Sequence, residues 1–360
     1  MGNNADVEKI LKENVKLIDR YIEKYVPREY TEDSLLFKIS PPRYEVDLEA
    51  LNKTVAEPIW RLLDSGGKRW RPALFLLVCE ALGGNPKKFL DFAIIPEIVH
   101  NGTLMADDVE DSSEFRRGKP CTHKLFGIDI AINASQLMYF LPMTVLSEKK
   151  KKLPDERARG VYEIYVQEMT NLSLGQATDI AWHRGLTSAY GVTEERYLQM
   201  CAYKTGTLAR MAAKMAAVLA GADADAVEKV GIFAESIGVA FQIQDDILDL
   251  VGEEFAKGKG GLGMDITEGK LTLMVINAIQ KADQADKKEL TRILGLHTEE
   301  ETSRKKAIAI IRKYGAIEHA RNFASKIVQD SWDEVDKVLP PSEAKDKLRT
   351  FAEYLIQRQI

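Results

Sequence analysis

The chain has 360 residues, 45% of them hydrophobic, and carries a formal net charge of −5 with a pI near 5.8. This length accommodates one large domain or two ordinary ones with a sizeable core. The acidic balance, with no dominant basic stripe, argues against a protein that binds nucleic acid.

The cysteines and the N-terminus indicate a location inside the cell. Cys79, Cys121 and Cys201 are scattered without metal-ligand spacing, which is typical of a reducing compartment. Residues 1–26 are charged throughout and contain no apolar signal core. The longest clean apolar run, residues 73–79, is too short to span a bilayer. We therefore expect a soluble, cytoplasmic protein without a membrane span.

Helical periodicity dominates the chain from its first residues. An apolar stripe over residues 6–26 predicts a helix, and prolines then break the pattern. We expect residues 1–45 to form this helix and a connector, and residues 46–360 to form the main domain. No stretch shows convincing period-two alternation, so the predicted fold is all-α with a single domain. The further helices are expected near residues 47–64, 70–82, 86–106, 127–147, 154–182, 193–220, 222–250, 267–283, 286–294, 301–336 and 341–358.

Two segments interrupt this helical pattern. Lys-Thr-Gly-Thr at residues 204–207 lies inside an otherwise apolar helix, where the glycine costs about 1 kcal/mol relative to alanine. This sequence fits either a break at a functional site or a second helix packed closely on the glycine. Residues 252–269 form a glycine-rich segment that contains Lys259, and such a loop can close over an anion.

Two acidic motifs stand at the ends of apolar helical runs. Asp-Asp-Val-Glu-Asp occupies residues 107–111, and Asp-Asp-Ile-Leu-Asp occupies residues 245–249. The helical period places the three aspartates of each motif on one side, where like charges repel. Divalent cations between two such clusters would offset the repulsion, and oxygen ligands suit Mg²⁺. Solvated helix ends explain one motif equally well, but they explain a pair less well.

Basic side chains gather close to the acidic motifs in the sequence. They fall in four groups, which are Lys68 with Arg71, Arg116 with Arg117, Lys204 alone, and Lys259 with Lys270. The sequence contains no Walker-type phosphate loop, dinucleotide-binding fingerprint or His-Glu-x-x-His zinc motif. His100 lies on the expected helix that carries the first acidic motif, and it fits either a phosphate contact or a satisfied core histidine. Acidic and basic sets together predict a site for a polyanionic ligand and metal.

These motifs, in their order and spacing, resemble the trans-isoprenyl diphosphate synthases, a family of prenyltransferases. The resemblance extends over roughly residues 48–330. Its motifs are Gly-Gly-Lys-x-x-Arg-Pro at 66–72, Asp-Asp-x-x-Asp with Arg-Arg-Gly-Lys-Pro at 107–120, Gly-Gln-x-x-Asp at 175–179, Lys-Thr at 204–205, Phe-Gln-Ile-Gln-Asp-Asp-Ile-Leu-Asp at 241–249, and Gly-Lys…Asp-x-x-x-Gly-Lys-x-Thr at 258–272.

The resemblance implies a homodimer of helical bundles, each around a deep central cavity, and head-to-tail condensation of isopentenyl diphosphate with an allylic diphosphate. It implies Mg²⁺, three ions in all, with Mn²⁺ as a substitute. The implied direct metal ligands are Asp107, Asp111 and Asp245. The aspartates implied to complete the metal site are Asp108, Asp246, Asp249 and Asp179.

The substrate contacts implied by the same resemblance fall into two sets. The allylic diphosphate would be bound by Arg116, Lys204, Thr205, Gln242, Lys259 and Lys270. Isopentenyl diphosphate would be bound by Lys68, Arg71, His100 and Arg117. The residues implied to be catalytic are Asp107, Asp108, Asp111, Lys204, Asp245 and Lys259. A terpene cyclase and a non-catalytic partner subunit remain as alternative functions.

Product length should depend on the residues behind the first acidic motif. Gly102 and Thr103 precede Asp107 by about 6–7.5 Å along the helix, and neither blocks a growing chain. Val99, one turn deeper, is also modest in size. The residue that stops the growing product would then come from a facing helix. Tyr139 or Phe140 could be that residue, although both could simply pack in the core. We expect a C20 product, geranylgeranyl diphosphate, with a longer polyprenyl diphosphate as the alternative.

Overall fold

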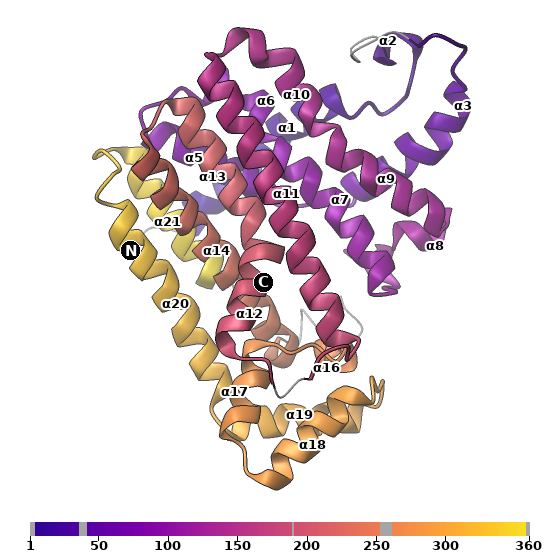
Figure 1. The fold of residues 1–360 in the computed structure, drawn as a ribbon, viewed down its shortest axis with the longest axis vertical. Helices are drawn as coiled ribbons and strands as arrows, with labels where there is room; N and C mark the ends of the chain where they lie inside the picture. The colour runs from indigo at the N-terminus through magenta and orange to yellow at the C-terminus, as the bar shows by residue number, and fades with distance from the viewer. Residues whose placement is uncertain (1–3, 36–41, 189–190, 253–260, 358–360) are drawn as a thin grey trace. The chain divides into compact units, whose positions relative to one another are not determined.

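The computed structural model describes residues 4–35, 42–188, 191–252 and 261–357. Almost all secondary structure in these residues is helical, which confirms the predicted all-α class (Figure 1). The deep central cavity remains a prediction.

The chain divides into two compact units. The first comprises residues 1–164, 212–223 and 342–345, and the second comprises residues 165–211, 224–341 and 346–360. Three of the five divisions fall inside helices, namely α11 (Asp155–His183), α13 (Thr207–Ala220) and α21 (Glu343–Gln357), and neither unit is one continuous stretch. The boundary predicted at residue 45 lies within the first unit.

The first unit is centred on α5, α7 and α9. Ala73, Leu74 and Phe75 of α5 are completely buried, and Ile98 of α7 is buried as well. α7 packs along α9, and α1 packs against α5. The helices of this unit before α11 are α1 (Asn4–Tyr25), α2 (Glu32–Leu35), α3 (Leu48–Leu51), the π-helix η1 (Asn52–Ala56), α4 (Glu57–Leu63), α5 (Trp70–Ala81), η2 (Pro86–Lys88), α6 (Leu90–Ala93), α7 (Ile95–Glu110), α8 (Thr122–Phe126), α9 (Ile128–Phe140), α10 (Pro142–Lys149) and η3 (Lys150–Lys152).

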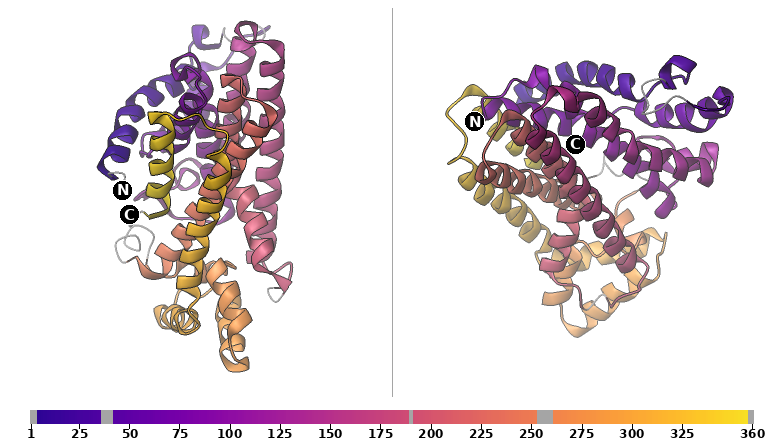
Figure 2. Two further views of the ribbon diagram at one scale, coloured as in Figure 1. Left: turned by 90° about the vertical axis from the view of Figure 1, so that its left-hand side faces the viewer. Right: turned by 45° about the horizontal axis from the view of Figure 1, so that its top comes forward.

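The second unit is built on the pairing of α14 with α20, which lie side by side in every view (Figures 1 and 2). The rings of Phe233 and Trp332 meet edge to face between them, with centroids 5.3 Å apart. The helices that lie wholly within this unit are α12 (Glu194–Cys201), the π-helix η5 (Ala202–Gly206), α14 (Ala224–Val251), α16 (Met264–Thr267), α17 (Leu273–Lys281), α18 (Gln284–Gly295), α19 (Glu301–Lys313) and α20 (Ala316–Val335).

Several predicted helices are divided in the structure. The helix expected at 301–336 breaks at Gly315, whose φ of +67° is the left-handed conformation that ends helices. The one expected at 127–147 divides before Pro142, and the one expected at 86–106 is interrupted ahead of Pro96. Local breaks of this kind cannot be read from apolar periodicity, which continues across them.

A short hairpin follows the first acidic motif, although no strand was expected. β1 (Phe115–Arg116) pairs antiparallel with β2 (Lys119–Pro120). The turn residues Arg117 and Gly118 both have positive φ values, 53° and 72°, as a type I′ turn requires. Strands of two residues are too short to show alternation. The hairpin fixes the directions of the two consecutive arginines.

One described stretch, Ile128–Lys152, has the length and mean hydropathy, 1.3, of a membrane-crossing helix. The structure buries 44% of its most apolar window, and Pro142 divides it into α9 and α10. Helices of a protein core pass the same test, so this stretch is weak evidence for a membrane span.

Candidate functional site

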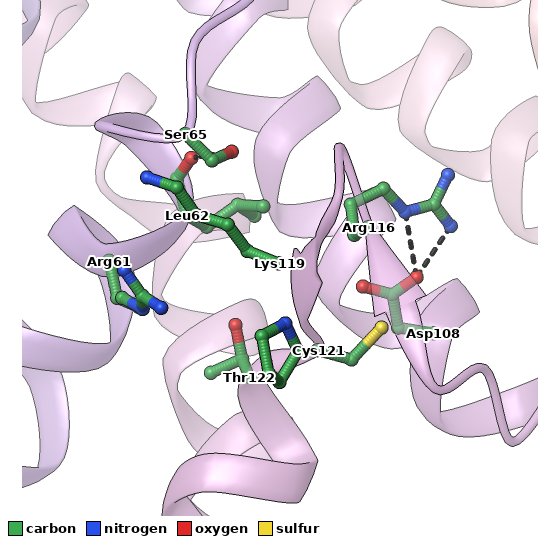
Figure 3. A pocket seen from close by; sticks show the side chains of 9 residues that line it. Arg61, Leu62, Ser65, Asp108, Arg116, Lys119, Cys121 and Thr122 are labelled. Atoms are coloured by element: carbon green, nitrogen blue, oxygen red, sulfur yellow. Dashed lines mark hydrogen bonds and ion pairs between the residues drawn. The ribbon is translucent and has the colours of Figure 1, made fainter. Parts of the chain in front are cut away.

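The first acidic motif lies at the C-terminal end of α7, in the first unit. Asp107 and Asp111 are one helical turn apart and partly exposed, whereas Asp108 is 1% exposed. Arg116 of the hairpin donates from Nε and Nη2 to Asp108 Oδ1 at 2.8 and 2.5 Å (Figure 3). Its Nη2 also lies 3.5 Å from Asp107 Oδ2. The motif therefore combines a buried, paired aspartate with two that reach the surface.

A small pocket adjoins this motif. Figure 3 shows the Cys121 sulfur close to the Asp108 carboxylate. Burial, and then the charge of Asp108, raises the pKa of the Cys121 thiol to about 12. The thiol therefore stays protonated at neutral pH and supplies no nucleophile. The pocket is lined by Arg61, Leu62, Ser65, Asp108, Arg116, Lys119, Pro120, Cys121 and Thr122.

The residues predicted to bind isopentenyl diphosphate all belong to the first unit. Lys68 is exposed and follows two glycines of positive φ, while Arg71 is buried at the start of α5. Arg117 donates to the carbonyl oxygen of Gly66. Burial lowers the pKa of His100 well below its ordinary value, and Arg71 and Arg117 lower it further. A neutral imidazole among guanidinium groups suits an anionic ligand.

The second acidic motif lies near the end of α14, in the second unit. Asp246 is 5% exposed and accepts from Tyr197 OH at 2.8 Å and from Gln242 Nε2 at 2.7 Å. Thr205 Oγ1 donates in turn to Gln242 Oε1 at 2.9 Å. Burial, followed by the charge of Asp265, raises the pKa of Asp246 well above its ordinary value. Two neutral side chains, the Tyr197 phenol and the Gln242 amide, therefore donate to this aspartate.

Asp249 of the same motif organises the chain that follows α14. Its carboxylate accepts from the backbone N–H groups of Met264 and Asp265 at 3.2 and 3.1 Å. Asp245 is partly exposed. Lys259 lies outside the described residues.

Lys270 follows α16 in the second unit. It pairs with Glu268, and its Nζ lies 3.8 Å from Asp265 Oδ1. The structure therefore brings Lys270 beside acidic groups of the second unit.

The helix interruption expected at residues 204–207 is a π-helical turn, η5. Lys204 Nζ lies 2.5 Å from Asp179 Oδ2, so the structure joins these two predicted site residues. A Cβ at Gly175 of α11 would overlap the Lys204 backbone, and one at Gly206 would lie 3.0 Å from Glu235 Cγ. Close packing on the glycine is therefore observed here, and the functional role of the break stays a prediction, one that π-bulges often fit.

Two groups of buried residues escaped the sequence analysis. Tyr197 precedes Lys204 by seven residues, and this helical spacing could have placed both on one face. Arg210 binds Glu168 through Nε and Nη2 at 2.8 and 2.6 Å, and Thr207 also donates to Glu168. No sequence signal links Glu168 to Arg210, because they lie on different helices.

Gly102 marks a close contact between α7 and α9. A Cβ there would lie 2.9 Å from Met138 Cβ and 3.1 Å from Tyr139 Cε1. Ser135 Oγ also donates to the Gly102 carbonyl oxygen at 2.9 Å. Tyr139 therefore packs beside Gly102, and its role in limiting product length stays a prediction.

The structure does not support the same role for Phe140. Its side chain is 72% exposed, on a face of α9 shared with exposed Ile128 and Ile132. Val99 is fully buried, and Thr103 Oγ1 donates to the His100 carbonyl oxygen at 2.7 Å. Of the two aromatic candidates, only Tyr139 contacts the α7 face.

The acidic motifs supply the hard oxygen donors that Mg²⁺ prefers. Among the described residues, no three His, Cys, Asp or Glu side chains form a group that could hold a metal ion. Mg²⁺ commonly takes one or two carboxylates and completes its shell with water and substrate phosphates. The donor set therefore fits an ion that arrives with a diphosphate.

Comparison with known proteins identifies the family. Residues 52–311 match the family model described as polyprenyl synthetase. The chain is 33% identical over 329 residues to the short chain isoprenyl diphosphate synthase of Methanothermobacter thermautotrophicus, covering 90% of this chain and 98% of that one. It is 34% identical over 300 residues to the geranylgeranyl diphosphate synthase of Methanosarcina mazei, covering 83% and 88%.

The fold agrees with these matches. The crystal structure of geranylgeranyl pyrophosphate synthetase from Pyrococcus horikoshii superposes with a TM-score of 0.83 at 30% identity, covering 98% of this chain and 99% of that one. The chain belongs to the polyprenyl synthetase family.

Proposed function

We propose that the protein condenses isopentenyl diphosphate head to tail with an allylic diphosphate, and that its main product is geranylgeranyl diphosphate. As a polyprenyl synthetase it is a prenyltransferase that elongates prenyl diphosphates. The observation that carries the reaction is the construction of both acidic motifs, each with a buried, hydrogen-bonded aspartate beside a partly exposed one.

Divalent metal serves diphosphate binding in this proposal. We propose that three Mg²⁺ ions are bound through Asp107, Asp111 and Asp245, with Mn²⁺ as a substitute. Bound Mg²⁺ would stabilise the negative charge that develops on the departing diphosphate. Asp108 and Asp246, held by Arg116 and by neutral donors respectively, keep the neighbouring carboxylates in place.

Two cationic sets would orient the substrates. Lys204, Thr205 and Gln242 of the second unit, with Arg116, Lys259 and Lys270, bind the allylic diphosphate. Lys68, Arg71, His100 and Arg117 bind isopentenyl diphosphate in the first unit. Holding two reactants in the reactive orientation lowers the activation free energy by several kcal/mol, on the order of 7 in well-oriented cases.

The reaction needs little side-chain acid–base chemistry. The allylic C–O bond breaks as diphosphate leaves, and the double bond of isopentenyl diphosphate attacks the carbocation. Loss of one proton to the released diphosphate restores an alkene. The chain's contribution is to bind diphosphate and to exclude water from the cation.

The contact between Gly102 and Tyr139 supports the proposed C20 product, as do the geranylgeranyl diphosphate synthases among the relatives. Purified protein would be incubated with Mg²⁺, farnesyl diphosphate and labelled isopentenyl diphosphate, and product length measured by chromatography. Tyr139→Ala should lengthen the product, whereas Tyr162→Ala, at an exposed ring of α11, serves as the control and should not. A wild-type product no longer than farnesyl diphosphate would refute the C20 proposal, and longer chains would favour the polyprenyl alternative.

Gly102→Phe tests the other side of this contact. A side chain here meets Met138 and Tyr139 on α9, so the product should shorten, and thermal stability should fall because the helices must move apart. An unchanged product from a folded Gly102→Phe protein would contradict this account of length control.

We also propose that the protein acts in the cytoplasm as a homodimer. Ile128, Ile132, Gln136 and Phe140 follow one another every four residues and are all exposed on α9. This stripe, which is apolar except for Gln136, fits a second copy of the chain better than water. Light scattering should give twice the chain mass for the wild type and a lower mass for Ile132→Glu. A monomeric wild-type protein would refute the proposed homodimer.

A further inference from the structure

Arg69 lies within the Gly-Gly-Lys-Arg-Trp-Arg-Pro segment, but its side chain turns into the first unit. The residue is 4% exposed. Its Nε donates to Asp19 Oδ1 of α1 at 2.9 Å, and its Nη1 donates to Glu97 Oε1 of α7 at 3.1 Å. Its Nη2 donates to the Leu63 carbonyl oxygen at the end of α4, at 3.2 Å. One guanidinium therefore ties three helices to the segment.

The backbone at Arg69 is as unusual as the side chain. Its φ and ψ are 49° and 39°, the left-handed region, immediately before α5 begins. This conformation costs a non-glycine residue about 1–2 kcal/mol, so surrounding contacts must hold it. The three hydrogen bonds that the Arg69 side chain donates stabilise this left-handed conformation. The turn sets the position of Lys68 before it and of Arg71 after it.

Arg117 of the hairpin also binds this segment. Arg117 donates to the Gly66 carbonyl oxygen. A Cβ at Gly67 would lie 3.0 Å from Arg69 Nη1 and 3.3 Å from Arg117 Nη2, so both guanidinium groups flank this glycine. Burial, then the charge of Arg69, lowers the pKa of Arg117.

The repulsion between these arginines is offset by buried acid. Glu97 is 3% exposed and also accepts from Asn101 Nδ2 at 3.2 Å, so its carboxylate is fixed beside Arg69. Removing a partner from such a buried pair leaves an uncompensated charge. The Arg69–Glu97 pair therefore allows the guanidinium groups of Arg69 and Arg117 to lie together beside Gly67.

We propose that Arg69 is a positioning residue for the isopentenyl diphosphate subsite, and that α1 takes part in it through Asp19. Arg69 does not contact substrate. It holds the turn that presents Lys68 and Arg71, so its loss weakens isopentenyl diphosphate binding selectively. The inference rests on the proposed function, which assigns Lys68 and Arg71 to that substrate.

The test is steady-state kinetics with both substrates varied. Arg69→Lys keeps the charge but cannot make three directed hydrogen bonds. It should raise the KM for isopentenyl diphosphate about tenfold and leave the KM for the allylic diphosphate within about twofold. Asp19→Asn alters a carboxylate whose own side chain is 41% exposed, so it should shift the same KM in the same direction by about threefold.

Arg28→Lys is the matched control. Arg28 makes a two-pronged pair with Asp64, both bonds 3.0 Å, at the exposed end of α4. Its loss should leave both KM values unchanged. Equal rises in both KM values, or a loss of kcat alone, in Arg69→Lys and Asp19→Asn would overturn the inference. Failure of the wild type to consume isopentenyl diphosphate would instead refute the proposed function. If Arg69→Lys does not fold, Asp19→Asn alone decides.

Discussion

The two acidic motifs share their spacing but differ in what holds them. In the first, the buried Asp108 is paired with a cation, Arg116. In the second, the buried Asp246 is held by a phenol and an amide, and Asp249 by backbone N–H groups. Within the first motif, part of the negative charge is already compensated by protein. By contrast, the Tyr197, Gln242 and backbone N–H donors of the second motif are uncharged.

This difference has a physical consequence. A carboxylate that pairs with arginine gains Coulomb energy, which salt screens, whereas bonds to neutral donors are nearly insensitive to salt. The first motif should therefore respond to ionic strength and the second to the loss of specific donors. Asp107 and Asp245, which are partly exposed, are the members of the two motifs that we propose bind metal and diphosphate.

Replacing these two exposed aspartates should have the largest effect. Asp107→Ala and Asp245→Ala should each lower kcat/KM by at least about a hundredfold, because metal-assisted charge stabilisation is lost. Circular dichroism should show unchanged helix content. Asp330→Ala, which removes only a surface pair with Lys326, is the control. Near-normal turnover in either variant would remove that motif from the site.

The buried aspartates test how each motif is held. Asp249→Asn turns an acceptor of two backbone N–H groups into a partial donor, and should cost about 1–3 kcal/mol in the free energy of unfolding. Asp108→Asn keeps an oxygen near Arg116 but removes the charge of a carboxylate that is 1% exposed, and should cost about 1–3 kcal/mol as well.

Urea unfolding at low and high salt separates the two mechanisms. The cost of Asp108→Asn should shrink in about 1 M salt, where the Debye length is about 3 Å, and that of Asp249→Asn should not. Equal salt dependence in the two variants would erase the distinction between the motifs.

The sequence predicts much of this arrangement, because carboxylates at helical spacing and glycine–lysine segments are local patterns. It does not show which aspartates are buried. Asp246 depends on Tyr197, 49 residues away, and Asp249 depends on amides 15 and 16 residues ahead. Both contacts arise from tertiary packing. The break at Gly315 escaped prediction for another reason, since the apolar period continues across it.

The two cationic sets extend the comparison to the substrates. Lys68→Ala should raise the KM for isopentenyl diphosphate, and Lys204→Ala the KM for the allylic diphosphate. Each should change kcat/KM by about tenfold, or roughly 1.4 kcal/mol, because charge-assisted phosphate contacts are strong. Lys204 also pairs with Asp179, so Lys204→Ala leaves that carboxylate without this partner. Identical effects of both variants on both substrates would contradict separate subsites.

The smallest expected effect concerns pH and His100. Its pKa is lowered by burial and then by Arg71, Arg117 and Arg116, so the ring is neutral in the free enzyme above its ordinary range. A depressed histidine pKa means that proton uptake begins only at a pH below the ordinary histidine range. The kcat/KM for isopentenyl diphosphate reports the free enzyme, so its profile should not bend within that ordinary range because of His100. His100→Gln keeps a neutral donor and should give a superimposable profile, displaced by a constant factor. An inflection near pH 6.5 in the wild type that His100→Gln lacks would show that the surrounding arginines do not hold the ring neutral.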